Sequence, residues 1–240
     1  MRRASPLLKL QEPAQDQWGL VTRRQAQAAG IGQSTLDRLT AEGGSLERVT
    51  RGVYQLAGAP IADHRDLRAA WLQLAPDRPA WERTPDQGVV SHRSAASLCG
   101  LGHLPADRHE FTVPRRRQTR RADVRIHVRP LHDGEWIEVG GLPVTRPARI
   151  ASDLIRDHED PEAIAQLIAD AVRAGLERPE AFAGSLARHA RSFGLRAGDG
   201  VALLSRLLGM TGDRERSRWI DRARGHIDHA AGGTAARPGR

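Results

Sequence analysis

Apolar residues recur at helical spacing along two short segments near the start of the chain, residues 22–29 and 33–42, which a glycine-containing stretch separates. Thr22 and Gln25 have the spacing of a capping box, in which the hydroxyl accepts from the third amide and the glutamine side chain reaches back to the first. A pair of glycines ends the second segment. This pattern predicts a helix that starts at Thr22, a tight turn, and a second helix.

Two β-rich runs follow within residues 48–56, arranged around Gly52, and they predict a hairpin. A short helix over residues 7–17 is expected before the helical pair, with boundaries blurred by Pro13. Asp63 is expected to cap a further helix over residues 64–75. A helical pair followed by a hairpin is the order of a winged helix-turn-helix.

The rest of the chain mixes short strands with helices. Ser91 is expected to cap a helix, and the apolar stripe that follows Asp160 predicts the clearest helix of the chain. The strand candidates are residues 111–113, 124–128, 136–139 and 142–144. We therefore predict an α+β protein in which a winged helix-turn-helix precedes a mixed domain with a helical C-terminal half. The expected parts are a DNA-binding domain at residues 1–75, a second domain at 76–225 and a disordered tail at 226–240.

Composition indicates a globular protein with a polyanionic partner. Hydrophobic residues make up 39% of the chain and charged residues 28%, which suffices for folded cores. The formal net charge is +8, and Lys9 is the one basic residue that is not arginine. Arginine presents a planar fork of donors suited to phosphates and guanine edges. A basic surface without a specific partner is the alternative interpretation of the charge.

Several function classes are disfavoured by what the chain contains. Cys99 is the sole cysteine, which excludes an internal disulfide and a multi-cysteine zinc site and suits the reducing cytoplasm. No apolar run approaches the roughly 20 residues of a membrane span. The histidine spacings predict no metal site, and we expect no cofactor. Ser91 and His92, with the later Asp153, lack the Gly-x-Ser-x-Gly turn of a hydrolase, so a helix cap beside a histidine is favoured and no catalytic residue is predicted.

The second helix of the pair has a predicted reading face. Each residue turns a helix by about 100°, so if Leu36 and Leu39 point inward, the side chains on the opposite side of the helix point outward. In a helix-turn-helix this outward side faces the DNA major groove. The hairpin would grip phosphates or enter the minor groove. The predicted DNA contacts are Gln33, Ser34, Thr35, Asp37 and Arg38 on the helix and Arg48 and Arg51 on the hairpin. The alternative is a helical domain that uses the same shape to bind a protein.

Five segments resemble AbiEi-type antitoxins, the regulator half of type IV toxin–antitoxin systems. The N-terminal winged helix of that family is similar to residues 19–22, 29–32 and above all Arg48-Val-Thr-Arg-Gly-Val-Tyr54. The second-domain motifs of its actinobacterial branch are similar to residues 91–96 and 141–148, with Asp153 soon after. Together these segments fall within about residues 16–176.

The resemblance implies a transcriptional repressor that binds inverted repeats of double-stranded DNA in its own promoter. It also implies that the second domain opposes a nucleotidyltransferase-like toxin. Some relatives carry a C-terminal domain resembling very-short-patch-repair endonucleases, but only about 40 residues follow Gly198 here, so we expect none. An endonuclease-related protein and a protein-interaction module stay as alternative functions.

A run of arginines stands between two of the strand candidates. Seven positive charges fall within residues 115–129, against one acid, Asp123. A solvated loop explains the run, and so does a surface that touches DNA or the RNA substrate of a toxin. The residues of this possible basic surface are Arg115, Arg116, Arg117, Arg120 and Arg121.

Overall fold

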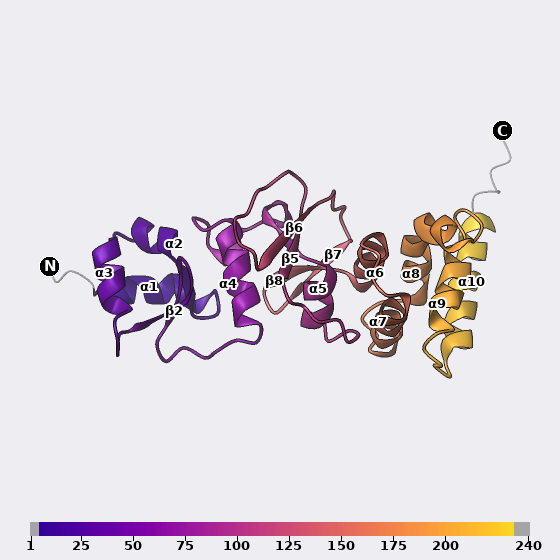
Figure 1. Ribbon diagram of the computed structural model, residues 1–240, viewed down its shortest axis with the longest axis horizontal. Coiled ribbons are helices and arrows are strands. Elements are labelled where there is room, and N and C mark those ends of the chain that lie inside the picture. The colour runs from indigo at the N-terminus through magenta and orange to yellow at the C-terminus, as the bar shows by residue number, and fades with distance from the viewer. Residues whose placement is uncertain (1–4, 233–240) are drawn as a thin grey trace, which may run out of the picture. The chain divides into compact units, whose positions relative to one another are not determined.

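The computed structural model describes residues 5–232, and their side chains as far as residue 226. It is an α+β structure, as the sequence predicts (Figure 1). The helices are α1 Pro6–Gln15, α2 Arg23–Ala28, α3 Gln33–Leu39, α4 Arg65–Leu74, α5 His92–Leu98, α6 Pro147–Arg156, α7 Pro161–Arg173, α8 Pro179–Leu186, α9 Gly200–Leu208 and α10 Arg216–Gly232. Three 3-10 helices are η1 Ala80–Glu82, η2 Pro85–Gln87 and η3 Ala187–Phe193.

The described strands form two sheets. Their bounds are β1 Leu20–Thr22, β2 Leu46–Thr50, β3 Val53–Leu56, β4 Val89–Val90, β5 His109–Val113, β6 Val124–Val128, β7 Trp136–Val139 and β8 Leu142–Thr145. The first sheet has the order β1-β3-β2 and the second the order β6-β5-β4-β8-β7. β3 is antiparallel to both β1 and β2. The predicted hairpin is formed by β2 and β3, and β3 is the central strand of the first sheet.

The chain divides into two compact units. Among the described residues, the first contains 5–90, 111–131 and 138–143, and the second contains 91–110, 132–137 and 144–232. The predicted boundary between residues 75 and 76 lies inside the first unit. Hydrogen bonds explain this, because Thr22 and Gln25 of the winged helix donate to the carbonyl oxygens of Pro76 and Arg78.

One small core holds the winged helix together. It joins side chains from every element of this part of the chain, so α3 and the hairpin share the same support. The buried members are Leu10, Val21, Ala26, Ile31, Leu36, Leu46 and Tyr54, with Leu39 and Leu56 packed against them. Leu36 and Leu39 thus face inward, as predicted.

Arg83 closes the end of α4 within the first unit. Its guanidinium donates to the carbonyl oxygens of Trp71, Leu72 and Ala75 at 2.6–2.7 Å and lies 4.4 Å from the centre of the Trp71 ring. These carbonyls are the ones that a helix C-terminus leaves without partners. Burial lowers the pKa of Arg83 to about 10. The segment after α4 is therefore tied to that helix.

Helices dominate the second unit. α6 packs against α5, α7 and α8, and α9 packs against α7, α8 and α10. The stripe predicted after Asp160 is buried, and the Asp160 carboxylate accepts from the Glu162 amide as a helix cap. The α8–α9 contact is close, since a Cβ at Gly200 would come within 1.8 Å of the Ala183 carbonyl oxygen.

Three local predictions differ from the structure. α4 begins after His64, which has a left-handed φ of 55°, and the Asp63 carbonyl accepts from Arg68 Nε instead of Asp63 capping the helix. Ser91 precedes α5 as expected, but its hydroxyl contacts the His92 ring and no backbone amide. α10 continues to Gly232 into the predicted tail, and residues 233–240 lie outside the described residues.

The turn between α2 and α3 yields a stability prediction. Gly30 has a φ of 79°, and an added Cβ would meet only Lys9 Nζ, at 3.9 Å, so conformation and not space requires glycine here. We expect Gly30→Ala to lower the free energy of unfolding by about 1–2 kcal/mol. Gly30→Asn should lose less, because asparagine tolerates the left-handed region. Urea unfolding measures the loss of stability in each variant, and equal losses in the two variants would contradict the prediction.

Candidate nucleic-acid interface

The capping box places α2 and, through it, the reading helix. The Thr22 hydroxyl accepts from the Gln25 amide at 3.1 Å, and Gln25 Oε1 accepts from the Thr22 amide at 2.9 Å, so the predicted box is confirmed. α2 ends where the Ile31 amide bonds to the Ala26 carbonyl across Gly30. The Lys9 ammonium donates to the Ala29 carbonyl at 3.4 Å, which joins α1 to the same turn.

α3 exposes the face that its sequence predicts. Ser34, Asp37 and Arg38 are exposed, and Gln33 and Thr35 are half-buried. The exposed face therefore combines a hydroxyl, a carboxylate and a guanidinium, groups of the kinds that can donate to and accept from base edges.

Two side chains of this face are already paired with each other. Gln33 Nε2 donates to Asp37 Oδ1 at 2.6 Å, one helical turn away. Gln33 Oε1 has no hydrogen-bond partner among the described residues. The bond fixes the direction of both polar groups before any ligand arrives, which lowers the entropy that binding would cost.

The wing is short and its tip is anchored. Arg48 on β2 and Arg51 in the turn are both exposed. The Gly52 carbonyl, beside Arg51, accepts from the Arg23 amide at 2.9 Å and from Gln73 Nε2 at 3.0 Å. These bonds hold the tip against the start of α2 and against α4, so the guanidinium of Arg51 projects from a fixed backbone.

Sequence reasoning missed two arginines next to this tip. Arg23 and Arg24 open α2 and are exposed, and the Arg23 backbone is bonded to Gly52. The signal was present in the sequence, because both follow the Thr22 cap directly. Arg23 therefore lies beside the wing tip, and Arg24 follows it on α2.

A buried amide network joins the winged helix to the segment that follows α4. Gln17 and Gln25 exchange two hydrogen bonds, of 2.8 and 3.1 Å, between their side chains. Gln17 Oε1 also accepts from the Ala80 amide, and Gln25 Nε2 donates to the Arg78 carbonyl, each at 3.1 Å. Buried amides are costly unless they are satisfied, so this network specifies one position for residues 76–80.

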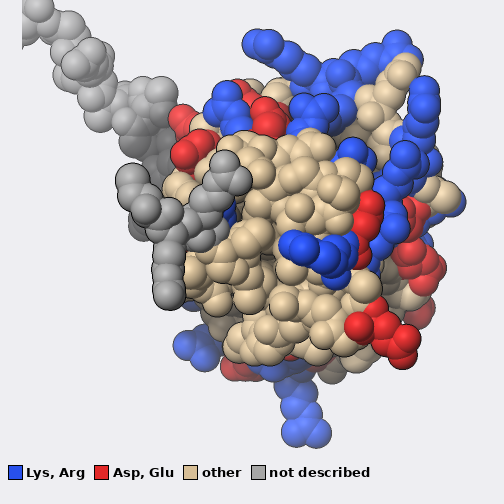
Figure 2. Space-filling view, turned by 90° about the vertical axis from the view of Figure 1, so that its left-hand side faces the viewer, with Lys and Arg blue, Asp and Glu red and all other residues tan. Residues whose placement is uncertain are grey.

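Charge is unevenly spread over the face on which α3 lies. Figure 2 shows a central area of uncharged side chains with Lys and Arg gathered mainly toward its upper and right edges. Asp and Glu side chains are fewer and scattered. The charged residues of α3 itself are Asp37 and Arg38.

The arginine run forms an exposed segment between β5 and β6, as its composition predicts. Arg115, Arg116, Arg117 and Arg120 are exposed, and Arg121 is half-buried. Arg117 donates to the Gln87 carbonyl at 3.3 Å, and Arg121 pairs with Asp123 through two hydrogen bonds. The other three have no ion pair or side-chain hydrogen bond among the described residues.

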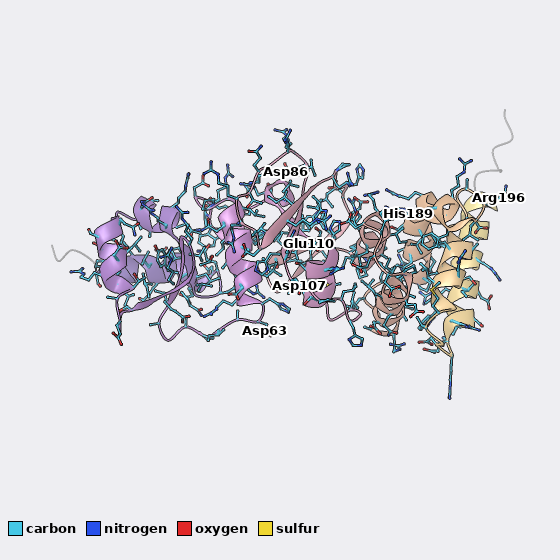
Figure 3. All side chains as sticks on the ribbon, viewed as in Figure 1. Asp63, Asp86, Asp107, Glu110, His189 and Arg196 are labelled. Atoms are coloured by element: carbon cyan, nitrogen blue, oxygen red, sulfur yellow. The ribbon has the colours of Figure 1, made fainter. Side chains whose placement is uncertain are left out.

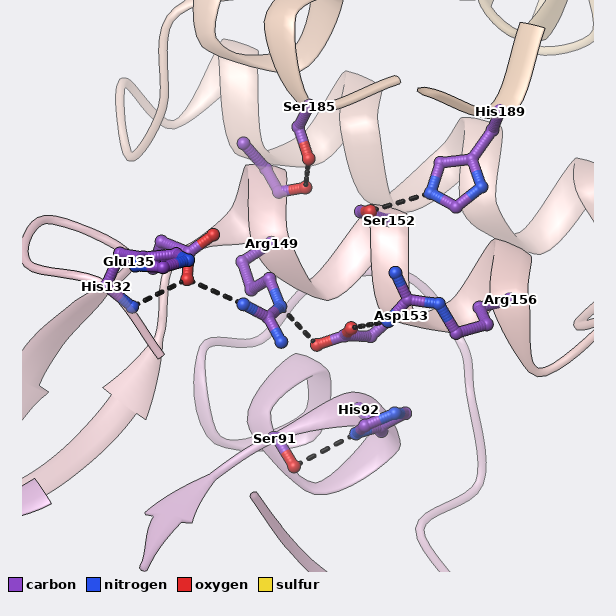
Figure 4. A network of polar contacts seen from close by, with 11 residues as sticks. Ser91, His92, His132, Glu135, Arg149, Ser152, Asp153, Arg156, Ser185 and His189 are labelled. Atoms are coloured by element: carbon purple, nitrogen blue, oxygen red, sulfur yellow. Dashed lines mark hydrogen bonds and ion pairs between the residues drawn. The ribbon is translucent and has the colours of Figure 1, made fainter. Parts of the chain in front are cut away.

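A second polar cluster lies within the second unit, around Asp153 (Figure 4). Asp153, which is 1% exposed, accepts from Arg149 at 2.8 Å and from Arg156 at 3.2 Å, and Arg149 also donates to Glu135 at 2.6 Å. Ser91 and His92 contact each other at 2.9 Å. Asp153 is thus engaged by two guanidinium groups, which is the arrangement of a structural ion network.

His189 extends this cluster toward η3. Its Nε2 lies 2.7 Å from Oγ of Ser152 on α6. Burial, together with the positive charges of Arg156 and Arg188, lowers the pKa of His189 to about 4. The imidazole is therefore neutral near neutral pH.

Within the described residues, no helix has the length and apolarity required to cross a membrane.

Comparison with known proteins identifies the N-terminal segment. Residues 9–57 match the family model described as transcriptional regulator, AbiEi antitoxin, which confirms the resemblance drawn from the sequence. This match supports a DNA-binding role in transcription regulation and a place in a toxin–antitoxin system. No curated protein matches the chain.

One solved structure is similar over most of the chain. It is the crystal structure of the RV2827C protein from Mycobacterium tuberculosis, with a TM-score of 0.50 and 17% identity over 88% of this chain and 78% of that chain. At this identity the likeness concerns the fold.

The lowered pKa of His189 yields a pH prediction. The unfolded chain takes up a proton near pH 6.5, whereas the folded chain does so only near pH 4, so folding stability should fall as the pH drops through this window. We expect His189→Gln to reduce that fall in urea unfolding measurements. His103→Gln, at an exposed position, is the control and should keep it. The same pH dependence in wild type and His189→Gln would refute the assignment.

Proposed function

We propose that this protein is a transcriptional repressor that reads DNA with α3 and grips it with the short wing. The observation that carries the proposal is the shared core beneath α3 and the hairpin, which fixes the exposed polar face of one relative to the basic edge of the other. Groove reading requires this fixed relation, because base contacts and phosphate contacts must be made together.

Each side chain has a proposed role. Arg38 forks onto a guanine, and Asp37 accepts from the amino group of a cytosine. Gln33, Ser34 and Thr35 contact base edges or phosphates at the start of α3. Arg48 and Arg51 bind phosphates and set the register, and Arg23 and Arg24 add further phosphate contacts.

The biological setting follows from the family match. We propose that the DNA target is a set of inverted repeats in the protein's own promoter, and that the second unit opposes a nucleotidyltransferase-like toxin in the cytoplasm. The AbiEi match at residues 9–57 supports a regulator and antitoxin role. The inverted repeats and the kind of toxin rest on the resemblance of the sequence motifs. The proposed role is non-catalytic and needs no cofactor.

The alternative function, a protein-interaction module, can be distinguished from DNA binding by one experiment. Phosphate contacts make DNA affinity fall steeply as salt rises, with a slope that counts the contacts. A winged helix that bound only a protein would give no salt-dependent DNA complex. Fluorescence anisotropy with duplex DNA, titrated in salt, therefore tests the proposed function directly.

The first test of individual residues compares two arginines. A duplex selected by the protein from a random pool serves as target, with a scrambled duplex as reference. Arg38→Ala should reduce the preference for the target by roughly 5- to 150-fold, the loss of one bidentate base contact. Arg51→Ala should weaken binding to both duplexes equally and should reduce the slope of log affinity against log salt concentration by about 1.

The two variants are expected to behave differently, because Arg38→Ala should lose sequence preference and Arg51→Ala should lose affinity for both duplexes. A preference that survives in Arg38→Ala would remove Arg38 from base reading. A loss in Arg51→Ala confined to the selected duplex would make Arg51 a base contact.

The arginine run is proposed as a second basic surface, for DNA backbone or for the RNA substrate of a toxin. Arg115, Arg116 and Arg120 are the ones to replace, since Arg117 and Arg121 make contacts within the fold. Their triple replacement by Ser should change the free energy of unfolding by no more than about 0.5 kcal/mol. We expect it to weaken DNA affinity or protection from the toxin.

A charge-matched control is available on α10 and just before it. Ser at Arg214, Arg216 and Arg218 removes the same charge from another exposed segment. If the variant in the run keeps both full DNA affinity and full protection, the run is a solvated loop.

A further inference from the structure

A group of arginines in the second unit surrounds two adjoining hollows. The larger hollow, of about 500 Å³, is lined by residues 196–202 and by Arg224. The smaller, of about 320 Å³, is lined by Ala187, Arg188, Arg191, Ala197 and Gly198. Ala197 and Gly198 belong to both, so the hollows share a wall.

The charges that line the hollows are mostly uncompensated. Arg188, Arg191 and Arg196 are exposed, and their side chains have no ion pair or hydrogen bond among the described residues (Figure 3 labels Arg196). Arg224 lies 3.8 Å from Asp221, a loose surface pair. The hollows therefore combine four guanidinium groups with little internal neutralisation.

One acid faces the larger hollow. The Asp199 carboxylate accepts from the Ala202 amide at 2.9 Å, so it serves as the cap of α9. A single half-buried carboxylate does not balance four arginines. Gly198, with a φ of 83° and nothing within 4 Å of an added Cβ, leaves the shared wall bare.

We propose that the two hollows bind consecutive phosphate groups. Arginine forks match phosphate oxygens, and two hollows with a common wall suit phosphates linked in a chain better than a single anion. The same chemistry is offered by the phosphates of a nucleoside triphosphate and by the backbone of a nucleic-acid strand. This site is separate from the winged helix and does not depend on the proposed repressor function.

The test uses the full chain and inorganic tripolyphosphate. We expect saturable binding at low salt by calorimetry, with protection of the amides of residues 196–202 from hydrogen exchange, which locates the ligand. Arg191→Ser/Arg196→Ser should weaken binding at least tenfold, as expected for the loss of charge-assisted hydrogen bonds. Arg214→Ser/Arg218→Ser removes the same charge elsewhere, and its affinity for tripolyphosphate should stay within about twofold of the wild-type value.

A second pair of variants keeps the test independent of arginine replacement. Ala197→Glu places a negative charge in the shared wall and should abolish the protection, whereas Ala197→Gln, of the same size, should retain it. ATP and a single-stranded oligonucleotide then identify the source, since the true ligand should compete with tripolyphosphate. Absence of protection in the wild type, or equal losses in both arginine pairs, would overturn the proposal.

Discussion

Two buried glutamines determine where the reading elements stand. Gln17 and Gln25 are nearly inaccessible to solvent, yet the side-chain amide of each is hydrogen-bonded to the other glutamine and to backbone groups of β1 and residues 78–80. A network of this kind is stable only in one arrangement, because any slip leaves a buried donor or acceptor unpaired. The start of α2 is part of that network, and the wing tip is bonded to the start of α2. The hydrogen bonds of these two buried glutamines therefore fix the backbone that carries the exposed residues of the candidate interface.

Much of this arrangement was predictable because its causes are local. The capping box fixed the start of α2, and helical periodicity placed Leu36 inside and Arg38 outside. What escaped prediction depends on distant partners. β1 has only three residues and exists because it pairs with β3. Likewise, the Pro and Gly content of residues 76–88 does not show that they belong to the first unit, where hydrogen bonds to Thr22, Gln17 and Gln25 and the capping of α4 by Arg83 hold them.

Arginine content alone could not have identified the candidate sites. The same side chain closes α4 at Arg83, binds Asp153 in a buried ion pair at Arg149, and stands exposed at Arg38 and Arg191. Sequence spacing does not distinguish these uses, since each depends on which carbonyl or carboxylate the fold brings near. The number of arginines without such partners, and not the net charge, is what bears on polyanion binding.

The acids near the reading face add a constraint of the opposite sign. Asp37 sits on the exposed side of α3, and Glu47, on β2, is only partly compensated by Arg65 at 3.0 Å. A carboxylate facing DNA is repelled by phosphates wherever no donor from a base meets it, so it weakens binding to most sequences. It is tolerated where a cytosine amino group lies opposite. Phosphate contacts alone do not distinguish one DNA sequence from another, so discrimination requires groups that penalise the wrong sequence. Under the proposed function, Asp37, which is held by Gln33, is the group that would exert that penalty.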